Sequence, residues 1–98
     1  MKQTKIITTI GPASEDKEIL KKLYDAGANI ARINCSHFEE EEFLRKVNNI
    51  KELNKTGETN FSILLDTKGP EIRTTMMDTP LEIKASDKVI VTIPEFAD

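Results

Sequence analysis

The chain has 98 residues, of which 38% are hydrophobic and 32% are charged, and its formal net charge is −3. This composition is typical of a globular domain and excludes a disordered chain, while the acidic balance argues against nucleic acid as the main partner. No apolar stretch approaches the roughly 20 residues that cross a bilayer, which argues against a membrane protein.

Strand-like and helix-like segments alternate through most of the chain. The β-branched run at 4–10 predicts a strand buried on both faces, which stops at Gly11-Pro12. A helix is predicted next, with Ser14 as its N-cap, and Gly27 is placed to end it in a left-handed conformation. The patterns that follow predict a strand at 29–35, a helix at 38–54 and a strand at 61–67. The order β-α-β-α-β is typical of an α/β fold with a parallel sheet covered by helices.

The pattern changes after Thr74, where two alternating runs at 81–84 and 88–93 flank a short turn. Such runs predict an antiparallel hairpin rather than another βα unit. We therefore expect a domain boundary near 75–80. Because three parallel strands cannot close a barrel and leave a sheet edge open, we expect the chain to be the beginning of a longer protein.

Polar side chains gather where the second and third predicted strands end. Arg32, Asn34 and Ser36 occupy alternate positions, so they share one face of a strand. The following strand ends at Asp66-Thr67-Lys68. Ligands bind at the carboxyl ends of the strands in parallel α/β folds, which makes this edge the predicted site.

The residue types at this edge suit a phosphorylated ligand beside a metal ion. Four residues offer hard oxygen ligands from amide, hydroxyl, carboxylate and main-chain groups, namely Asn34, Ser36, Asp66 and Thr67. Three cations are placed to neutralise phosphate, namely Arg32, Lys68 and Arg73.

Each of these residues also has a plainer interpretation. Asn34 and Ser36 are common at strand ends, where their side chains bond to the backbone, and Arg32 is compatible with a surface position. His37 alone is typical of a helix start or a surface. The segment 66–70 is compatible with an ordinary turn and loop.

The residues next to this edge are interpreted as structural. The acidic run 39–42 is interpreted as a solvated helix N-terminus, and Cys35 as a small apolar residue that faces the helices. Because Cys35 is the single cysteine, it excludes an internal disulfide and fits a reducing cytoplasm.

Three segments together resemble the pyruvate kinase family, namely TKIITTIGPAS at 4–14, GANIARINCSH at 27–37 and ILLDTKGPEIRT at 63–74. The resemblance covers essentially the whole chain, but only the opening of the family's longer chain. It implies a (β/α)8 TIM barrel interrupted after its third strand by a β-rich lid domain. Residues 1–74 would then begin the barrel, and 75–98 would begin the lid. It also implies a glycolytic transferase that moves the phosphoryl group of phosphoenolpyruvate to ADP, giving pyruvate and ATP, with Mg²⁺ and K⁺ as cofactors.

The resemblance implies roles for individual residues. Arg32 matches the arginine that contacts the transferring phosphate, which makes it the expected catalytic residue. The positions that match the lining of the nucleotide phosphates are Asn34, His37 and Arg73. The implied potassium ligands are Asn34, Ser36, Asp66 and, through its carbonyl, Thr67. Two residues of the signature loop are given a supporting role, namely Lys68 and Glu71.

The chain departs from the family's pattern at two positions. The family usually has an aromatic residue where Cys35 stands and a glycine where Phe38 stands. A side chain at position 38 is expected to alter the start of the second helix and the approach of the nucleotide to His37. The family's catalytic lysine and magnesium-binding carboxylates lie on later strands, so we expect the 98-residue chain alone to be inactive.

Two functional hypotheses follow. The first is that the chain is part of a cytoplasmic pyruvate kinase. The full-length enzyme is then expected to be a homotetramer, without a nucleic-acid or membrane partner. The second is a short, non-catalytic binding or assembly module derived from the same fold. A reading frame that continues past Asp98 would favour the first. In both cases an exposed apolar face and an open sheet edge predict self-association of the chain.

Overall fold

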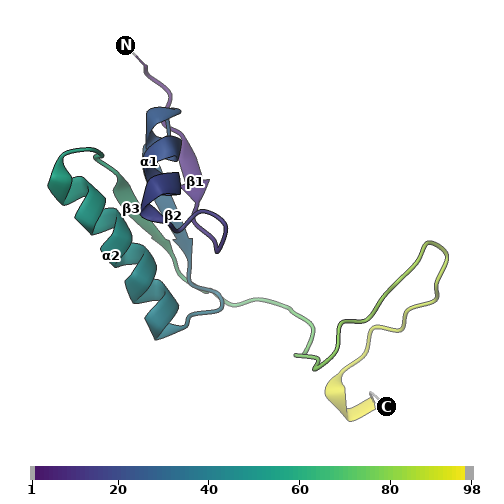
Figure 1. The fold of residues 1–98 in the computed structure, drawn as a ribbon. Coiled ribbons are helices and arrows are strands. Elements are labelled where there is room, and N and C mark those ends of the chain that lie inside the picture. Colours follow the sequence, from purple (N-terminus) through teal and green to yellow (C-terminus); the bar gives the residue numbers. More distant parts are fainter. Residues whose placement is uncertain (1, 97–98) are drawn as a thin grey trace.

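A computed structural model describes residues 2–96 of the chain (Figure 1). The predicted alternation of strands and helices is confirmed. The elements in order are β1 Ile7–Thr9, α1 Lys17–Asp25, β2 Ile30–Asn34, α2 Glu40–Thr56, β3 Ser62–Asp66 and a 3₁₀ turn, η1, at Pro94–Phe96. Residue 1 of the first predicted domain and residues 97–98 of the second lie outside the described residues.

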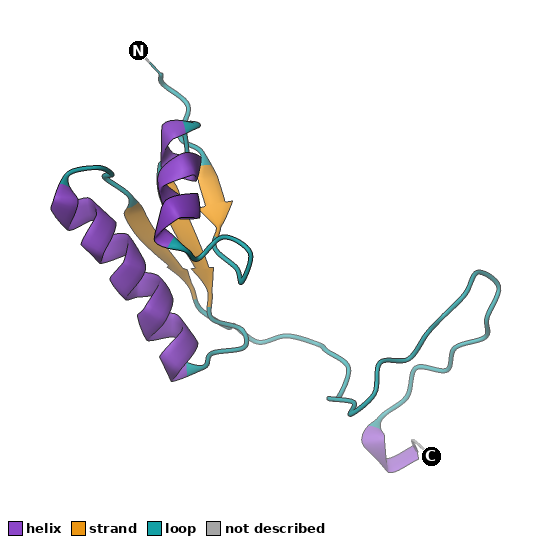
Figure 2. Cartoon of the chain, in the orientation of Figure 1, coloured by secondary structure: helices purple, strands orange, loops and turns teal. Residues whose placement is uncertain are grey.

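The three strands form one parallel sheet in the order β1-β2-β3 (Figure 2). The register sets Thr9 beside Arg32, Arg32 beside Leu64, and Asn34 beside Asp66. All three strands therefore end at the same edge of the sheet. This is the parallel α/β architecture that the sequence predicts.

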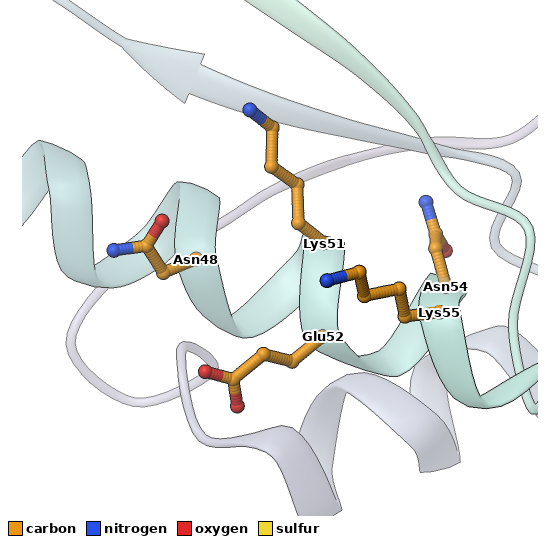
Figure 3. A pocket seen from close by; sticks show the side chains of 5 residues that line it. All are labelled: Asn48, Lys51, Glu52, Asn54 and Lys55. Carbon is orange, nitrogen blue, oxygen red and sulfur yellow. The ribbon is translucent and has the colours of Figure 1, made fainter.

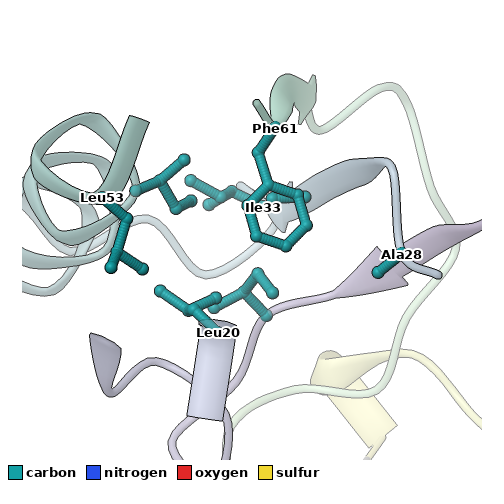
Figure 4. Packing of buried hydrophobic residues seen from close by; sticks show 8 residues of the cluster. Leu20, Ala28, Ile33, Leu53 and Phe61 are labelled. Atoms are coloured by element: carbon teal, nitrogen blue, oxygen red, sulfur yellow. The ribbon is translucent and has the colours of Figure 1, made fainter. Parts of the chain in front are cut away.

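One face of the sheet packs against α1 and α2 (Figure 4). Ala31 and Ile33 of β2 point to the helices, while the alternate residues Arg32 and Asn34 point to the opposite face. The buried cluster joins all the layers, and its members are Ile10, Leu20, Ala28, Ala31, Ile33, Ile50, Leu53 and Phe61. Cys35 packs against this cluster, as predicted.

Two predictions about the first βα unit are wrong. The first strand is not buried on both faces, because the sheet has a helix layer on one face only and Ile7 is 52% exposed. Ser14 does not cap α1, because its hydroxyl accepts a hydrogen bond from the Gly11 N–H (3.0 Å) within the turn after β1. The helix begins later, with Asp16 at the N-cap position.

The C-terminal ends of the helices agree with the sequence prediction more closely than their N-terminal ends do. Gly27 and Gly57 both have positive φ, of 116° and 82°, which an L side chain rarely adopts. α2 begins at Glu40, two positions after the predicted start at Phe38, and its first turn carries three acidic residues, as the favourable charge at a helix N-terminus predicts.

Residues 67–96 form an extended segment without strands (Figure 1). The predicted hairpin strands at 81–84 and 88–93 are therefore wrong for this structure, although the turn between them is present. Asp87 closes that turn by donating its N–H to the Lys84 carbonyl (3.1 Å). Every residue from 66 to 95 is exposed, so the alternating apolar side chains have no surface to pack against, and an isolated pair of strands is marginal in water.

Candidate phosphate and cation site

The open face of the sheet carries a polar row at its carboxyl edge. Arg32 lies at the centre of this row. Its Nη1 donates to Thr9 Oγ1 on β1 (2.9 Å), and its Nε donates to Asp66 Oδ2 on β3 (3.1 Å). Nη2 also pairs with Asp66 Oδ2. One guanidinium therefore links all three strand ends.

Asn34 and Asp66 lie side by side at the same edge. They are partners in the β2–β3 register, and the Cys35 N–H donates to the Asp66 carbonyl (2.9 Å). Asn34 Oδ1 accepts the Ser36 N–H (3.0 Å), which fixes the first turn of the loop after β2. The structure thus brings together Arg32, Asn34 and Asp66, as predicted. Ser36 follows closely, but it lies in a turn beyond the end of β2 and not on the strand face that carries Arg32 and Asn34.

A second polar cluster joins the loops that follow β2 and β3. Glu71 pairs with Arg73 Nε (2.8 Å) and with Lys68 Nζ (3.7 Å). Arg73 Nη1 lies 3.1 Å from His37 Nε2, and because a guanidinium can only donate, this His37 nitrogen is the acceptor. His37 and Arg73 also line one open hollow of about 500 Å³.

The two clusters place three cationic side chains beside two carboxylates, and every one of these side chains has solvent access. Arg32 and Arg73 each contact a carboxylate rather than lying free. These ion pairs hold the two arginines in position, and each guanidinium has more N–H donors than these contacts use.

The oxygen atoms at this edge are of the type that hard cations bind. Asn34, Ser36, Asp66 and the Thr67 carbonyl are hard donors with a single carboxylate among them. Within residues 2–96, no hydrogen bond occupies Asp66 Oδ1 or the Ser36 hydroxyl, so both remain available. The same part of the chain holds no group of three or more His, Cys, Asp or Glu side chains placed to share a metal ion.

Another hollow lies elsewhere, along α2 (Figure 3). It has a volume of about 560 Å³ and is lined by Asn48, Lys51, Glu52, Asn54 and Lys55. These side chains diverge from the helix surface, and none of the predicted site residues is among them. We assign no ligand to this surface.

Two site features were missed at the level of sequence. Thr9 was not predicted to contact Arg32, although it stands at the end of a strand on the open face, and strand alternation alone would have indicated it. Lys46 was not singled out at all. Lys46 is buried in the structure. In the sequence it lies three positions after Phe43 and four before Ile50, and this spacing places it on the apolar side of α2. That spacing is the signal that would have identified it.

No helix in the described part of the chain has both the length and the apolar character needed to cross a membrane.

Comparison with known proteins gives one consistent result. The family model described as pyruvate kinase, barrel domain, matches residues 1–97. Pyruvate kinases of Staphylococcus aureus strains USA300 and NCTC 8325 are 47% identical over 96 residues, which is 97% of this chain but 16% of each relative. Two crystal structures of pyruvate kinase from Cryptosporidium parvum are 43% identical, with TM-scores of 0.64 and 0.66, and cover 69% and 76% of this chain. The chain spans about one sixth of the length of the curated relatives that it matches.

Proposed function

The chain belongs to the pyruvate kinase family, and from that premise we propose that it supplies one edge of the active site of an enzyme that transfers the phosphoryl group of phosphoenolpyruvate to ADP. The products are pyruvate and ATP. In this proposal residues 1–74 begin a TIM barrel and 75–98 begin a lid domain. The complete enzyme is a cytoplasmic, glycolytic homotetramer that uses Mg²⁺ and K⁺.

The observation that carries the proposal is the position of Arg32. It lies across the carboxyl ends of all three strands and is held by Thr9 and Asp66. A guanidinium has more N–H donors than these contacts use, so Arg32 can bind a phosphoryl oxygen without losing its supports. Phosphoryl transfer depends mainly on positioning and charge stabilisation, and a fixed cation beside the transferring group provides both.

The oxygen atoms of Asn34, Ser36, Asp66 and Thr67 would hold potassium at the same edge. A bound potassium ion supplies positive charge beside the phosphoryl group. Asp66 then has two functions, since one carboxylate oxygen supports Arg32 and the other is available to the cation. This sharing explains why a single acidic residue suffices at this edge of the sheet.

His37 and Arg73 would bind the nucleotide phosphates. They already lie within hydrogen-bond distance of each other, although they come from different loops. Glu71 supports this pair by its ion pair with Arg73, and Lys68 adds a further cation beside Glu71. The carboxylate prevents the two neighbouring cations from repelling each other when no phosphate is bound.

A chimeric enzyme tests the proposal. The matching segment of the Staphylococcus aureus pyruvate kinase is replaced by this chain, and pyruvate formation is followed in a coupled assay. We expect the chimera to be active and Arg32→Met to lower kcat/KM by about 100-fold or more, because a charge-stabilising donor is removed. Lys55→Met, on the outer side of α2, is the matched control and is expected to keep the activity of the parent chimera.

Two outcomes would contradict the proposal. The first is a folded chimera without activity, which would favour the non-catalytic binding module. The second is an active chimera in which Arg32→Met behaves like Lys55→Met. The purified 98-residue chain is expected to be inactive in the same assay, and turnover that persists through repurification would contradict that expectation.

A further inference from the structure

A lysine is buried within α2, close to the candidate site. Lys46 is 7% exposed, and its ammonium pairs with Glu42 Oε1 at 2.5 Å, one turn earlier in the helix. Lysine is almost never buried unless its charge is paired, because desolvation of an ammonium group is costly. The surface of α2 offers exposed positions for a lysine, so the buried position of Lys46 requires a reason.

The surroundings of Lys46 connect it to the loop after β2. A small hollow of about 20 Å³ lies between that loop and α2. Its lining from the loop side is Asn34, Cys35, His37, Phe38 and Glu39, and from the helix side Glu42, Phe43 and Lys46. Two of these residues, Asn34 and His37, belong to the candidate site. Lys46 therefore lies next to the segment of backbone that carries the candidate site.

The hollow has the size and polarity to hold one ordered water molecule. A single water needs roughly 10–15 Å³ of accessible volume and two or more polar partners. The ammonium of Lys46 has three donors, and Glu42 is the only hydrogen-bond acceptor that it has among residues 2–96. Its remaining donors are therefore available to a water molecule in the hollow or to the loop.

Phe38 covers the same region from outside. It is 60% exposed, yet its ring lies 5.2 Å from that of Phe43, at an interplanar angle of 51°. This contact joins the loop to α2 by an apolar surface, beside the buried ion pair. The ring contact thus joins the loop to the helix, while the Lys46–Glu42 pair lies within α2 and lines the hollow that the loop covers. The aromatic residue at position 38 therefore has a structural reason.

We propose that Lys46 and Glu42 are positioning residues that hold the loop 35–39 against α2 and thereby fix Asn34, Ser36 and His37 at the candidate site. Neither residue needs to touch a substrate. Both are on the helix side of the loop, while the site is at the strand edge. The role of these residues in positioning the loop does not depend on the proposed function. Its consequence for potassium and nucleotide binding does rest on the proposed function.

The charge state of the pair agrees with this role. The hydrogen bond from Lys46, followed by its positive charge, lowers the pKa of Glu42 below its ordinary value of 4.5. Glu42 is therefore ionised at neutral pH and remains the partner of the buried ammonium. The pair is present whenever the site would operate.

Amide hydrogen exchange of the 98-residue chain tests the positioning role directly. The informative amides are Ser36, which donates to Asn34 Oδ1, and Cys35, which donates to the Asp66 carbonyl. In Lys46→Met we expect both to exchange about tenfold faster, while Ile33 in the middle of β2 is unchanged. Lys46→Arg keeps the charge and is expected to restore slow exchange.

Lys51→Met is the matched control, because Lys51 is an exposed lysine of the same helix. It is expected to leave all three amides unchanged. An equal increase at Ser36, Cys35 and Ile33 in Lys46→Met would show general destabilisation and would overturn the proposal. Exchange that stays at the wild-type rate in Lys46→Met would also overturn it.

Kinetics of the chimeric enzyme give a second, separate readout. In Lys46→Met we expect the half-activating potassium concentration and the KM for ADP to rise about tenfold, with a smaller change in kcat. Lys46→Arg and Lys51→Met are expected to match the parent. A loss confined to kcat, or no change, would overturn the inference. An inactive parent chimera would instead overturn the proposed function, and the exchange experiment would still decide the role of Lys46.

Discussion

The β-α-β-α-β part of the chain and its extended segment, residues 67–96, contain similar apolar residues that reach opposite environments. Leu20 in α1 is fully buried, whereas Val91 in the extended segment is 94% exposed. The first region folds its apolar stripes onto one another, because each helix returns across the sheet. The second has an alternating pattern and no neighbouring layer. A hydrophobic pattern therefore predicts burial only where the same chain supplies the facing surface.

Truncation of apolar side chains gives the largest expected contrast between the two regions. Leu20→Ala removes a fully buried side chain and is expected to lower the free energy of unfolding by about 3 kcal/mol. Val91→Ala is expected to change it by less than about 0.5 kcal/mol. Urea unfolding followed by circular dichroism measures both. A loss from Val91→Ala as large as that from Leu20→Ala would show that the extended segment packs in solution.

Removal of a half-buried amide, that of Asn54, is the next largest effect. Asn54 near the end of α2 donates Nδ2–H to the Phe61 carbonyl (2.9 Å), and its Oδ1 accepts from the Phe61 N–H (2.9 Å) and the Thr59 hydroxyl (2.7 Å). Asn54→Ala is expected to destabilise the chain by about 2 kcal/mol, because three partners lose their bonds.

Asn48 provides the matched control for this prediction, since it is an exposed asparagine of the same helix. Asn48→Ala is expected to be neutral within about 0.5 kcal/mol in the same urea experiment. Equal effects of the two substitutions would contradict the assigned role of Asn54 in joining α2 to the start of β3.

Glycine substitution sharpens the comparison at the level of the backbone. Gly57 after α2 has φ of 82°, whereas Gly69 in the extended segment lies outside the left-handed region. A Cβ atom would meet nothing within 4 Å at either position, so only the backbone conformation differs. Gly57→Ala is expected to cost about 1 kcal/mol and Gly69→Ala close to none, measured from urea unfolding midpoints. A loss at Gly69 equal to that at Gly57 would contradict this account.

The order of the elements was predictable because local patterns specify it. β-branched runs and helical stripes near Leu20 and Ile50 were sufficient to place three strands and two helices. Burial was less predictable, because it depends on which layers lie nearby. The exposure of Ile7 and the missing strands at 81–93 both result from the absence of a second covering layer among the described residues.

The site divides in the same way. Arg32, Asn34 and Asp66 were predicted to meet because parallel strands end at one edge. The pairing of Arg32 with Asp66 was not predicted, since it depends on the strand register, which no local pattern specifies. Lys46 was missed because a lysine within a charged helix is usually a surface residue. The roles of these residues in binding phosphate and potassium stay predictions until the chimera is measured.

The smallest expected effect is the pH dependence that arises from Glu42. Its pKa is lower in the folded chain than the ordinary value of 4.5, because it accepts a hydrogen bond from Lys46 and lies beside its charge. Such a carboxyl stabilises the folded state at pH values above 4.5, and this stabilisation is lost as the pH falls through the folded-state pKa. The free energy of unfolding is therefore expected to decrease as the pH falls from the ordinary pKa of 4.5 to below the folded-state pKa.

Two substitutions test whether this dependence of the free energy of unfolding on pH comes from Glu42. Glu42→Gln is expected to make the decrease shallower, because the carboxyl that titrates is gone. Glu82→Gln in the extended segment is expected to leave it unchanged, since Glu82 is exposed and takes part in no ion pair among residues 2–96. The difference in pH dependence between Glu42→Gln and the unmodified chain is expected to be small, because water contacts Glu42 and screens its charge. Equal slopes in Glu42→Gln and the unmodified chain would show that the Glu42–Lys46 pair forms in the unfolded chain as well, or not at all.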